Sequence, residues 1–236
     1  MDPDAALARA LLSVAGDASL SVAVLDTATG ATAAYGSGSY HTASIVKVGI
    51  LATLLLRAQD AGRGPGAAEQ ALAASMIEHS DNASATALWK AIGGARGFDS
   101  GVRRLGLTRT RGGTNGEWGL TRTTAGDQLT LLRAVFGSGS ALEPASRDVL
   151  TSLMAKVVPG QAWGVSAAGT SWALKNGWLP RGAAARWTVN SIGRVTAEGR
   201  GRLIAVLSDG HATLPAGIAV TEAAARAAVT ATGGTG

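Results

Sequence analysis

The chain has 236 residues, which is enough for one large domain, or two closely packed lobes, with a sizeable core. It has no cysteine and only three scattered histidines, which excludes a disulfide framework and a thiol nucleophile and argues against a metal site. The net charge is +5, but the arginines are interleaved with acidic residues, so we expect no nucleic-acid partner. No apolar run approaches the ~20 residues of a transmembrane helix, so we expect no membrane span.

The first half of the chain is expected to open with a hairpin and to continue with helices. Two β-like runs flank the turn cluster at residues 26–30. From Ser44 the pattern becomes that of a long apolar helix, which ends near residue 62 in a glycine-rich break. Two further helices are expected on either side of Ser80-Asp81-Asn82, the second ending at Gly93-Gly94. The glycine-rich stretch 106–122 is expected to be a loop.

The second half is expected to hold two helices, three strands and a last helix. Thr124 and Asp127 form a start similar to a capping box for a helix that ends at Gly137. The remaining elements are expected at residues 144–157 (helix), 171–177, 186–195 and 202–208 (strands), and 215–230 (helix).

Strands at both ends with helices between them indicate an α+β fold. We expect one antiparallel sheet with the terminal helices packed on it, beside a helical lobe, and a cleft between the two. Residues 1–236 would then form a single domain, with a sheet lobe at about 18–43 and 160–232 and a helical lobe at about 44–159.

Three short motifs are candidates for chemistry. Ser44-Ile45-Val46-Lys47 opens the apolar helix, Ser80-Asp81-Asn82 lies between two helices, and Lys175-Asn176-Gly177 ends a strand. A serine and a lysine at i and i+3 share a helix face, so Lys47 can act as the base that activates the Ser44 hydroxyl. The unpaired N–H of Ser44 at a helix start can face a developing oxyanion.

The other two motifs would complete such a site. Ser80 can pass the proton to a leaving group, and Asn82 can hold both Lys47 and a substrate amide oxygen. Lys175, on the strand that lines the opposite wall of the expected cleft, can orient Ser80 and attract a carboxylate. A serine-lysine pair alone arises by chance about 0.3 times in a chain of this composition, but Ser-Asp-Asn only about 0.01 times.

Together these motifs resemble the penicillin-recognising serine hydrolases, above all the class A β-lactamases, whose signature is SxxK, SDN and KTG. The resemblance extends from about residue 20 to residue 228 and includes residues 21–30, 76–82 and 102–108. It implies a class A β-lactamase-like fold and an acyl-enzyme on Ser44, with no metal or cofactor. It also implies that the backbone N–H of Trp178 is the second oxyanion donor.

The substrate-binding wall departs from the family pattern. Asn176 replaces the hydroxyl residue with which the family binds a substrate carboxylate, and Gly177 matches the glycine of the family motif. Arg186 begins the next strand, where some class A enzymes keep an arginine for the same carboxylate; a surface salt bridge is the alternative. The indole of Trp178 is expected either to cover the pocket or to pack between strands. The segment between the nucleophile helix and Ser80 is also shorter than is usual.

The loop that serves deacylation departs further. Class A enzymes carry the glutamate that activates the deacylating water in an ExxLN motif. Here Glu117 and Leu120 match that motif, but Thr121 replaces the asparagine and the loop is too short. Glu117 is therefore either the deacylation base or a solvated loop carboxylate. Trp118 is expected to pack into the core rather than to line the cleft.

From these features we expect a serine hydrolase that forms an acyl-enzyme on an amide, β-lactam or ester and releases it slowly. The alternatives are a D,D-peptidase, esterase or transacylase on the same scaffold, or a non-catalytic penicillin-binding-like protein. The partner is expected to be a small molecule or a cell-wall peptide, and the protein a monomer. The acidic start carries no export signal, so we expect either export with the signal absent from this sequence or a cytoplasmic location.

Overall fold

The computed structural model describes residues 2–182 and 186–233. In that part of the chain the α-helices are α1 (Pro3–Leu11), α2 (Val46–Asp60), α3 (Ala67–Glu78), α4 (Asn82–Ala91), α5 (Gly94–Arg104), α6 (Ala125–Phe136), α7 (Pro144–Met154) and α8 (Leu214–Thr232). The strands are β1 (Ser19–Asp26), β2 (Thr32–Tyr35), β3 (Tyr40–His41), β4 (Arg122–Thr123), β5 (Ser171–Arg181), β6 (Arg186–Ala197) and β7 (Arg200–His211). Short 3₁₀ helices are η1 (Ala43–Ile45), η2 (Trp118–Leu120), η3 (Pro159–Gln161) and η4 (Gly164–Ala168).

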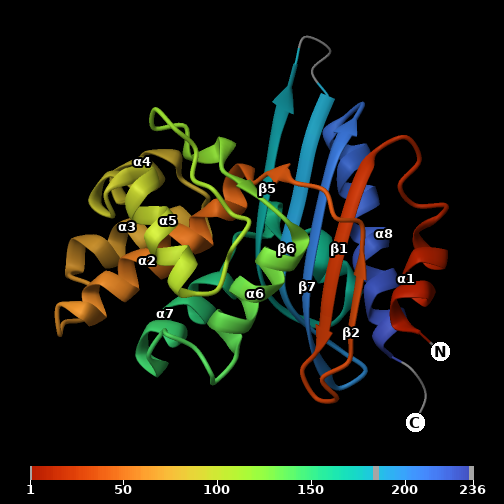
Figure 1. The fold of residues 1–236 in the computed structure, drawn as a ribbon, viewed down its shortest axis with the longest axis horizontal. Helices are drawn as coiled ribbons and strands as arrows, with labels where there is room; N and C mark the ends of the chain where they lie inside the picture. The colour runs from red at the N-terminus through yellow and green to blue at the C-terminus, as the bar shows by residue number, and fades with distance from the viewer. Residues whose placement is uncertain (1, 183–185, 234–236) are drawn as a thin grey trace.

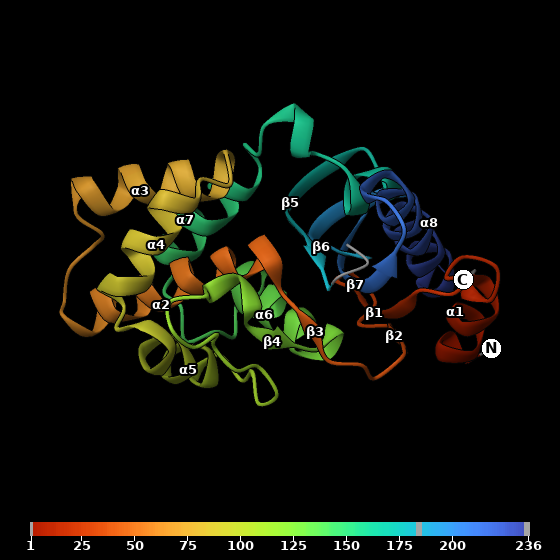
Figure 2. The ribbon, with the colours of Figure 1, turned by 90° about the horizontal axis from the view of Figure 1, so that it is seen from above.

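The centre of the molecule is an antiparallel five-stranded sheet in the order β2-β1-β7-β6-β5. Its first two strands come from the start of the chain and its last three from the end, as the sequence predicts. α1 and α8 cover one face, and α2 to α7 lie on the other side (Figures 1 and 2). The α+β fold predicted from the sequence is therefore confirmed.

The two faces of the sheet bury separate apolar cores, and the strands alternate between them. On β7, Leu203, Ala205 and Leu207 face the core that contains α2 to α7, whereas Ile204 and Val206 face the core beneath α1 and α8. This alternation follows from the two-residue period of a strand, because a strand buried on both faces is apolar at nearly every position. That residues 1–236 form a single domain, with a sheet lobe at about 18–43 and 160–232 and a helical lobe at about 44–159, stays a prediction.

α5 is the element that the sequence pattern missed. Its glycines read as a helix break, but they allow close packing against α2. A Cβ at Gly101 would collide with the side chain of Thr53, and Gly49 on α2 lies against Phe98. Glycine lowers helix propensity by about 1 kcal/mol, so this helix depends on its tertiary contacts. α1 was also not located by residue, although Asp2 caps it and Pro3 opens it.

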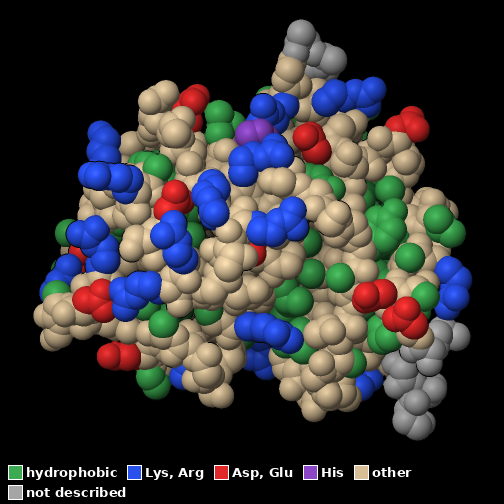
Figure 3. Space-filling view, viewed as in Figure 1, with side chains coloured by type: hydrophobic (Ala, Val, Ile, Leu, Met, Phe, Trp, Pro, Cys, Tyr) green, Lys and Arg blue, Asp and Glu red, His purple; other side chains and the backbone are tan. Residues whose placement is uncertain are grey.

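The charged residues are spread over the surface. Figure 3 shows Lys and Arg side chains distributed over one face of the molecule, with Asp and Glu among them. Within the described ranges, no helix is both long and apolar enough to cross a bilayer.

β5 is the edge strand of the sheet nearest to the helices, and it packs against η1 at the start of α2. This contact brings the motif that begins at Ser44 beside the motif that begins at Lys175.

Candidate active site

Ser44 lies in η1, the short turn that leads into α2, rather than in the α-helix itself. The residue before it, Ala43, has a φ of 47°, in the left-handed region that costs a non-glycine residue about 1–2 kcal/mol. Ser80 also has a positive φ, 59°. Strained backbone of this kind persists where the surrounding structure enforces it. Here it occurs immediately before Ser44 and at Ser80 itself.

Lys47 is the centre of the site. Its side chain is completely buried, and its Nζ lies 3.1 Å from Ser44 Oγ, 3.0 Å from Ser80 Oγ and 2.8 Å from Asn82 Oδ1. Nζ also donates to the Ser80 carbonyl oxygen at 2.6 Å. The predicted juxtaposition of Ser44, Lys47, Ser80 and Asn82 is thus present in the structure.

Burial lowers the pKa of Lys47 from its ordinary value to about 8, and the charge of nearby Asp81 opposes this shift. A lysine with this pKa is partly neutral at physiological pH, so its amine can accept a proton. Asp81 itself caps α4 by accepting a hydrogen bond from the Ser84 N–H at 2.6 Å. The Ser80-Asp81-Asn82 segment therefore both caps a helix and contributes three oxygen atoms to Lys47.

Lys175 is the second buried lysine. Burial, with a smaller contribution from the charge of Lys47, lowers its pKa to about 7. Its Nζ donates to the Asn176 carbonyl oxygen at 3.1 Å, and among the described residues it makes no hydrogen bond to Ser80. The expected direct orientation of Ser80 by Lys175 is therefore not present in this structure; Lys47 is the lysine that contacts Ser80.

Gly177 is required by close packing. A Cβ at this position would lie 2.6 Å from the Ser44 nitrogen and 2.7 Å from the Ile45 nitrogen. Only a glycine lets β5 lie against the backbone at the start of α2. Beyond it, the Trp178 indole stacks obliquely on Trp163, with ring centroids 5.7 Å apart.

The side chains expected to bind a substrate carboxylate have other partners. Asn176 is fully buried, and its Nδ2 donates to the carbonyl oxygens of Gln161 and Trp163 at 2.7 and 2.9 Å. Arg186 is exposed, and its guanidinium donates to the Gly210 carbonyl oxygen of β7 at 2.9 Å. β7 lies on the side of β6 away from β5, so this contact draws Arg186 away from the motif at residues 175–177.

Glu117 forms no bond to the other groups of the site within the described residues. Its side chain is exposed, just before η2, and makes no hydrogen bond or ion pair within the described ranges. Trp118 lies over the site instead: Lys47 Nζ is 4.9 Å from the centroid of the indole. The prediction that Trp118 packs into the core is only half right, because the ring packs against the core and also covers Lys47.

Asn190 is a site residue that the sequence reasoning missed. Its Nδ2 donates to the carbonyl oxygens of His41 and Thr42 at 2.9 and 3.1 Å, and its Oδ1 accepts from the Ser208 N–H at 3.2 Å. These bonds tie the backbone before Ser44 to the sheet. The available signal was an asparagine in the middle of an apolar strand, where this residue type is rare.

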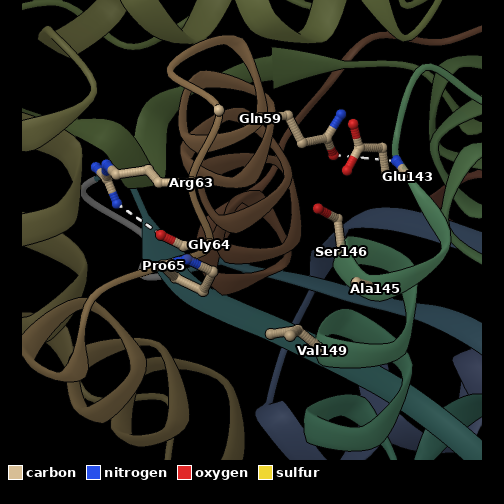
Figure 4. A pocket seen from close by; sticks show the side chains of 9 residues that line it. Gln59, Arg63, Gly64, Pro65, Glu143, Ala145, Ser146 and Val149 are labelled. Carbon is tan, nitrogen blue, oxygen red and sulfur yellow. Dashed lines mark hydrogen bonds between the residues drawn. The ribbon is translucent and has the colours of Figure 1, made fainter.

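A separate hollow of about 430 Å³ lies between the end of α2, residues 62–65 and the start of α7 (Figure 4). In this view the Gln59 side chain points toward Glu143, whose N–H donates to Gln59 Oε1 at 3.0 Å. The lining of this hollow includes Ser146 and the carboxylate of Glu143, but no hydrogen bond joins these two side chains. The candidate chemistry therefore stays at Ser44.

The fold matches those of known serine hydrolases. A class A beta-lactamase from Bacteroides cellulosilyticus superposes with a TM-score of 0.84 at 17% identity, covering 98% of both chains. A beta lactamase from Xanthomonas campestris pv. campestris gives 0.77 at 22% identity, covering 98% of this chain and 97% of the other. A mutant of PBP-A, an acyl-enzyme complex with penicillin G, gives 0.80 at 21% identity and 96% coverage of both. No curated protein matches the sequence.

The architecture is thus the class A β-lactamase-like fold. The sequence model of the Beta-lactamase enzyme family (Beta-lactamase2) matches residues 68–232, more than half of the chain, and the protein belongs to that family. The matched segment contains Ser80, Asn82 and Lys175 and begins after Ser44 and Lys47.

Proposed function

We propose that the protein is an acyl-transfer enzyme in which Ser44 attacks an amide, β-lactam or ester carbonyl and forms a covalent acyl-enzyme that is released slowly. The observation that carries this proposal is the contact between Lys47 Nζ and Ser44 Oγ, 3.1 Å, at a lysine whose pKa burial lowers to about 8. A neutral amine at this distance is within reach of the serine proton.

In the acylation step, Ser44 Oγ bonds to the carbonyl carbon while its proton moves to Lys47 Nζ. The oxyanion that forms is held by the N–H groups of Ser44 and Trp178. Ser80, 3.0 Å from Lys47 Nζ, passes the proton on to the leaving group as its bond to the carbonyl carbon breaks. Lys175 supports this relay electrostatically from the opposite wall.

Asn82 has two functions in this scheme. Its Oδ1 holds Lys47, at 2.8 Å, and its amide nitrogen binds the carbonyl oxygen of a substrate amide. Gly177 allows the substrate edge of β5 to approach Ser44. The roles of Asn176 and Arg186 toward a substrate carboxylate would require both side chains to leave their present backbone partners. The reaction needs no metal or cofactor.

Slow release follows from the loop that precedes α6. Deacylation requires a water beside the ester and a base that touches this water. The Glu117 side chain is exposed to solvent and makes no hydrogen bond or ion pair with a described residue, so we assign it no part in deacylation. Slow release of the acyl group favours a D,D-peptidase, esterase or transacylase over an efficient β-lactamase. We also propose a cell-wall peptide as one class of substrate. A further part of the proposal is an extracytoplasmic location.

Covalent labelling tests the proposal. A fluorescent penicillin and a fluorophosphonate should label the wild-type protein and not Ser44→Ala, and the exposed Ser152→Ala should be labelled like the wild type. Equal labelling of Ser44→Ala and the wild type would rule out Ser44 as the nucleophile. Absence of any label on the wild type with both probes would favour a non-catalytic binding protein.

A further inference from the structure

The loop at residues 113–121 places an indole, and not a carboxylate, beside Lys47. The centroid of the Trp118 ring lies 4.9 Å from Lys47 Nζ. The ring is fixed from the other side because Trp118 Nε1 donates to Thr86 Oγ1 on α4 at 3.1 Å. Trp118 therefore bridges from its own loop, across the lysine, to the helix that begins at Asn82.

The loop itself is held firmly against the chain that leads to Ser44. The Thr42 N–H donates to the Thr121 carbonyl oxygen at 2.8 Å, and His41 Nδ1 lies 3.0 Å from the Leu120 carbonyl oxygen. The Gly113 N–H donates to Thr121 Oγ1 at 3.1 Å, which closes the loop across its base. Thr121, the residue that replaces the expected asparagine, thus fixes the loop and with it the position of the indole.

The indole completes the enclosure of Lys47. Ser44, Ser80 and Asn82 supply the polar atoms around Nζ, the ring covers a further side, and the lysine is 0% exposed. A water that attacks an ester on Ser44 with help from Lys47 must touch Nζ. The indole has only one polar group, an N–H donor, and Thr86 already binds it, so the ring can neither hold nor activate such a water.

We propose that Trp118 is a positioning residue that keeps water away from Lys47 and so determines how long the acyl group stays on Ser44. The proposal rests on the acyl-enzyme chemistry described above and adds a cause for its slow hydrolysis. In hydrolysis, a water oxygen bonds to the acyl carbon, the bond from this carbon to Ser44 Oγ breaks, and a water proton goes to Oγ. An amine acceptor can replace the water: its nitrogen bonds to the acyl carbon, and one of its protons goes to Oγ as the bond to Ser44 breaks.

The test separates acylation from deacylation in Trp118→Ala, Trp118→Phe and Thr86→Val. Each variant is treated with penicillin G, and intact-protein mass spectrometry follows formation of the adduct and, after removal of free penicillin, its loss. Removing the ring should accelerate loss at least about tenfold, which is below the ~10²–10⁴ that a full general base contributes. Trp118→Phe keeps a ring but loses the hydrogen bond to Thr86, so it and Thr86→Val should both give a smaller acceleration than Trp118→Ala.

A variant that is merely damaged would lose acylation and would not gain deacylation. Faster deacylation with unchanged acylation therefore points to the shielding of Lys47 by the Trp118 ring and not to a folding defect. Loss of the adduct from Trp118→Ala at the wild-type rate would overturn the proposal and leave Ser44 as nucleophile intact. Failure of the wild type to form any adduct would overturn the acyl-enzyme mechanism itself. Added glycine ethyl ester should capture more of the acyl group from the wild type than from Trp118→Ala; equal capture would also contradict this shielding.

Discussion

Two regions that lie against the same lysine differ sharply in chemistry. Around Ser44, Ser80 and Asn82 every side chain offers an oxygen to Lys47 Nζ at 2.8–3.1 Å. On the side of the 113–121 loop, the neighbour is an indole, and the only carboxylate there, Glu117, is exposed. In the mechanism proposed above, the first region supplies the groups for acylation, and the second supplies none for deacylation. A fold shared with class A β-lactamases therefore does not by itself imply turnover.

The largest effect is expected from removing the base of the acylating region. Lys47→Ala should slow acylation by about 10²–10⁴, because the nucleophile stays while its proton acceptor is lost. Stopped-flow acylation with a chromogenic cephalosporin measures this rate. Lys90→Ala, an exposed lysine on α4, is the matched control and should behave like the wild type. Acylation of Lys47→Ala at the wild-type rate would exclude Lys47 as the base.

The pH dependence of acylation should be the next largest effect. Burial lowers the pKa of Lys47 to about 8 and that of Lys175 to about 7, so Lys175 loses its proton first. The rate should rise with pH and level off above about 8, and below pH ~7 it should fall about tenfold for each pH unit as Lys47 is protonated.

Asp81→Asn sharpens the pH experiment. An asparagine still caps α4 but removes the charge that raises the pKa of Lys47, so the profile should move to lower pH. A profile that is flat from pH 6 to 9, or that has its midpoint near 10.5, would show that Lys47 is not a lysine of lowered pKa acting as base.

A moderate effect is expected where the sheet holds the nucleophile. Asn190→Leu leaves the carbonyl oxygens of His41 and Thr42 and the Ser208 N–H without their partner, which should lower the free energy of unfolding by about 1–3 kcal/mol. Urea unfolding measures this change. Acylation should also slow, because the backbone before Ser44 loses its anchor.

Thr188→Val is the control for Asn190, because it removes one hydrogen bond, to Asp209, from the same strand. It should lower the free energy of unfolding by about 1 kcal/mol and leave acylation unchanged. Equal loss of acylation in both variants would mean that stability alone, and not the anchoring of residues 41 and 42, explains the effect.

The smallest effect is expected in the deacylating region. Glu117→Gln should change the rate at which the acyl group is released by no more than about twofold. A carboxylate that does not touch the water contributes none of the ~10²–10⁴-fold rate acceleration that a general base provides. Comparing the loss of the penicillin adduct from this variant and from the wild type gives the ratio. A large decrease in release would place Glu117 in the mechanism.

The acylating region was predictable from the sequence because each of its motifs has a local geometry. Ser44 and Lys47 are separated by one helical turn, and Ser80 and Asn82 lie at a capped helix start. That Lys47 contacts Ser80 and Asn82, 33 and 35 residues further along the chain, was expected from the occurrence of the motifs together and from their resemblance to a known family. The β-like runs at residues 171–177, 186–195 and 202–208 likewise predicted strands of the sheet.

The missed features depend on contacts between distant segments. The glycines of α5 indicate a break until Thr53 is known to need the space at Gly101. The position of Trp118 over Lys47 depends on hydrogen bonds from residues 41 and 42 to the loop, about 80 residues apart in the chain. No local pattern encodes such contacts, and the same holds for the partners that Asn176 and Arg186 take.

The central claim is that the region around Ser44 supports acylation, whereas the 113–121 loop does not support deacylation. A single time course tests this claim most directly. Wild-type protein is mixed with excess nitrocefin, and product release and intact mass are followed together. The account predicts a burst of about one product per protein as Ser44 becomes acylated, followed by an adduct that persists for minutes or longer. Rapid turnover without an adduct, abolished by Glu117→Gln with an adduct trapped on Ser44, would contradict it and define a working β-lactamase.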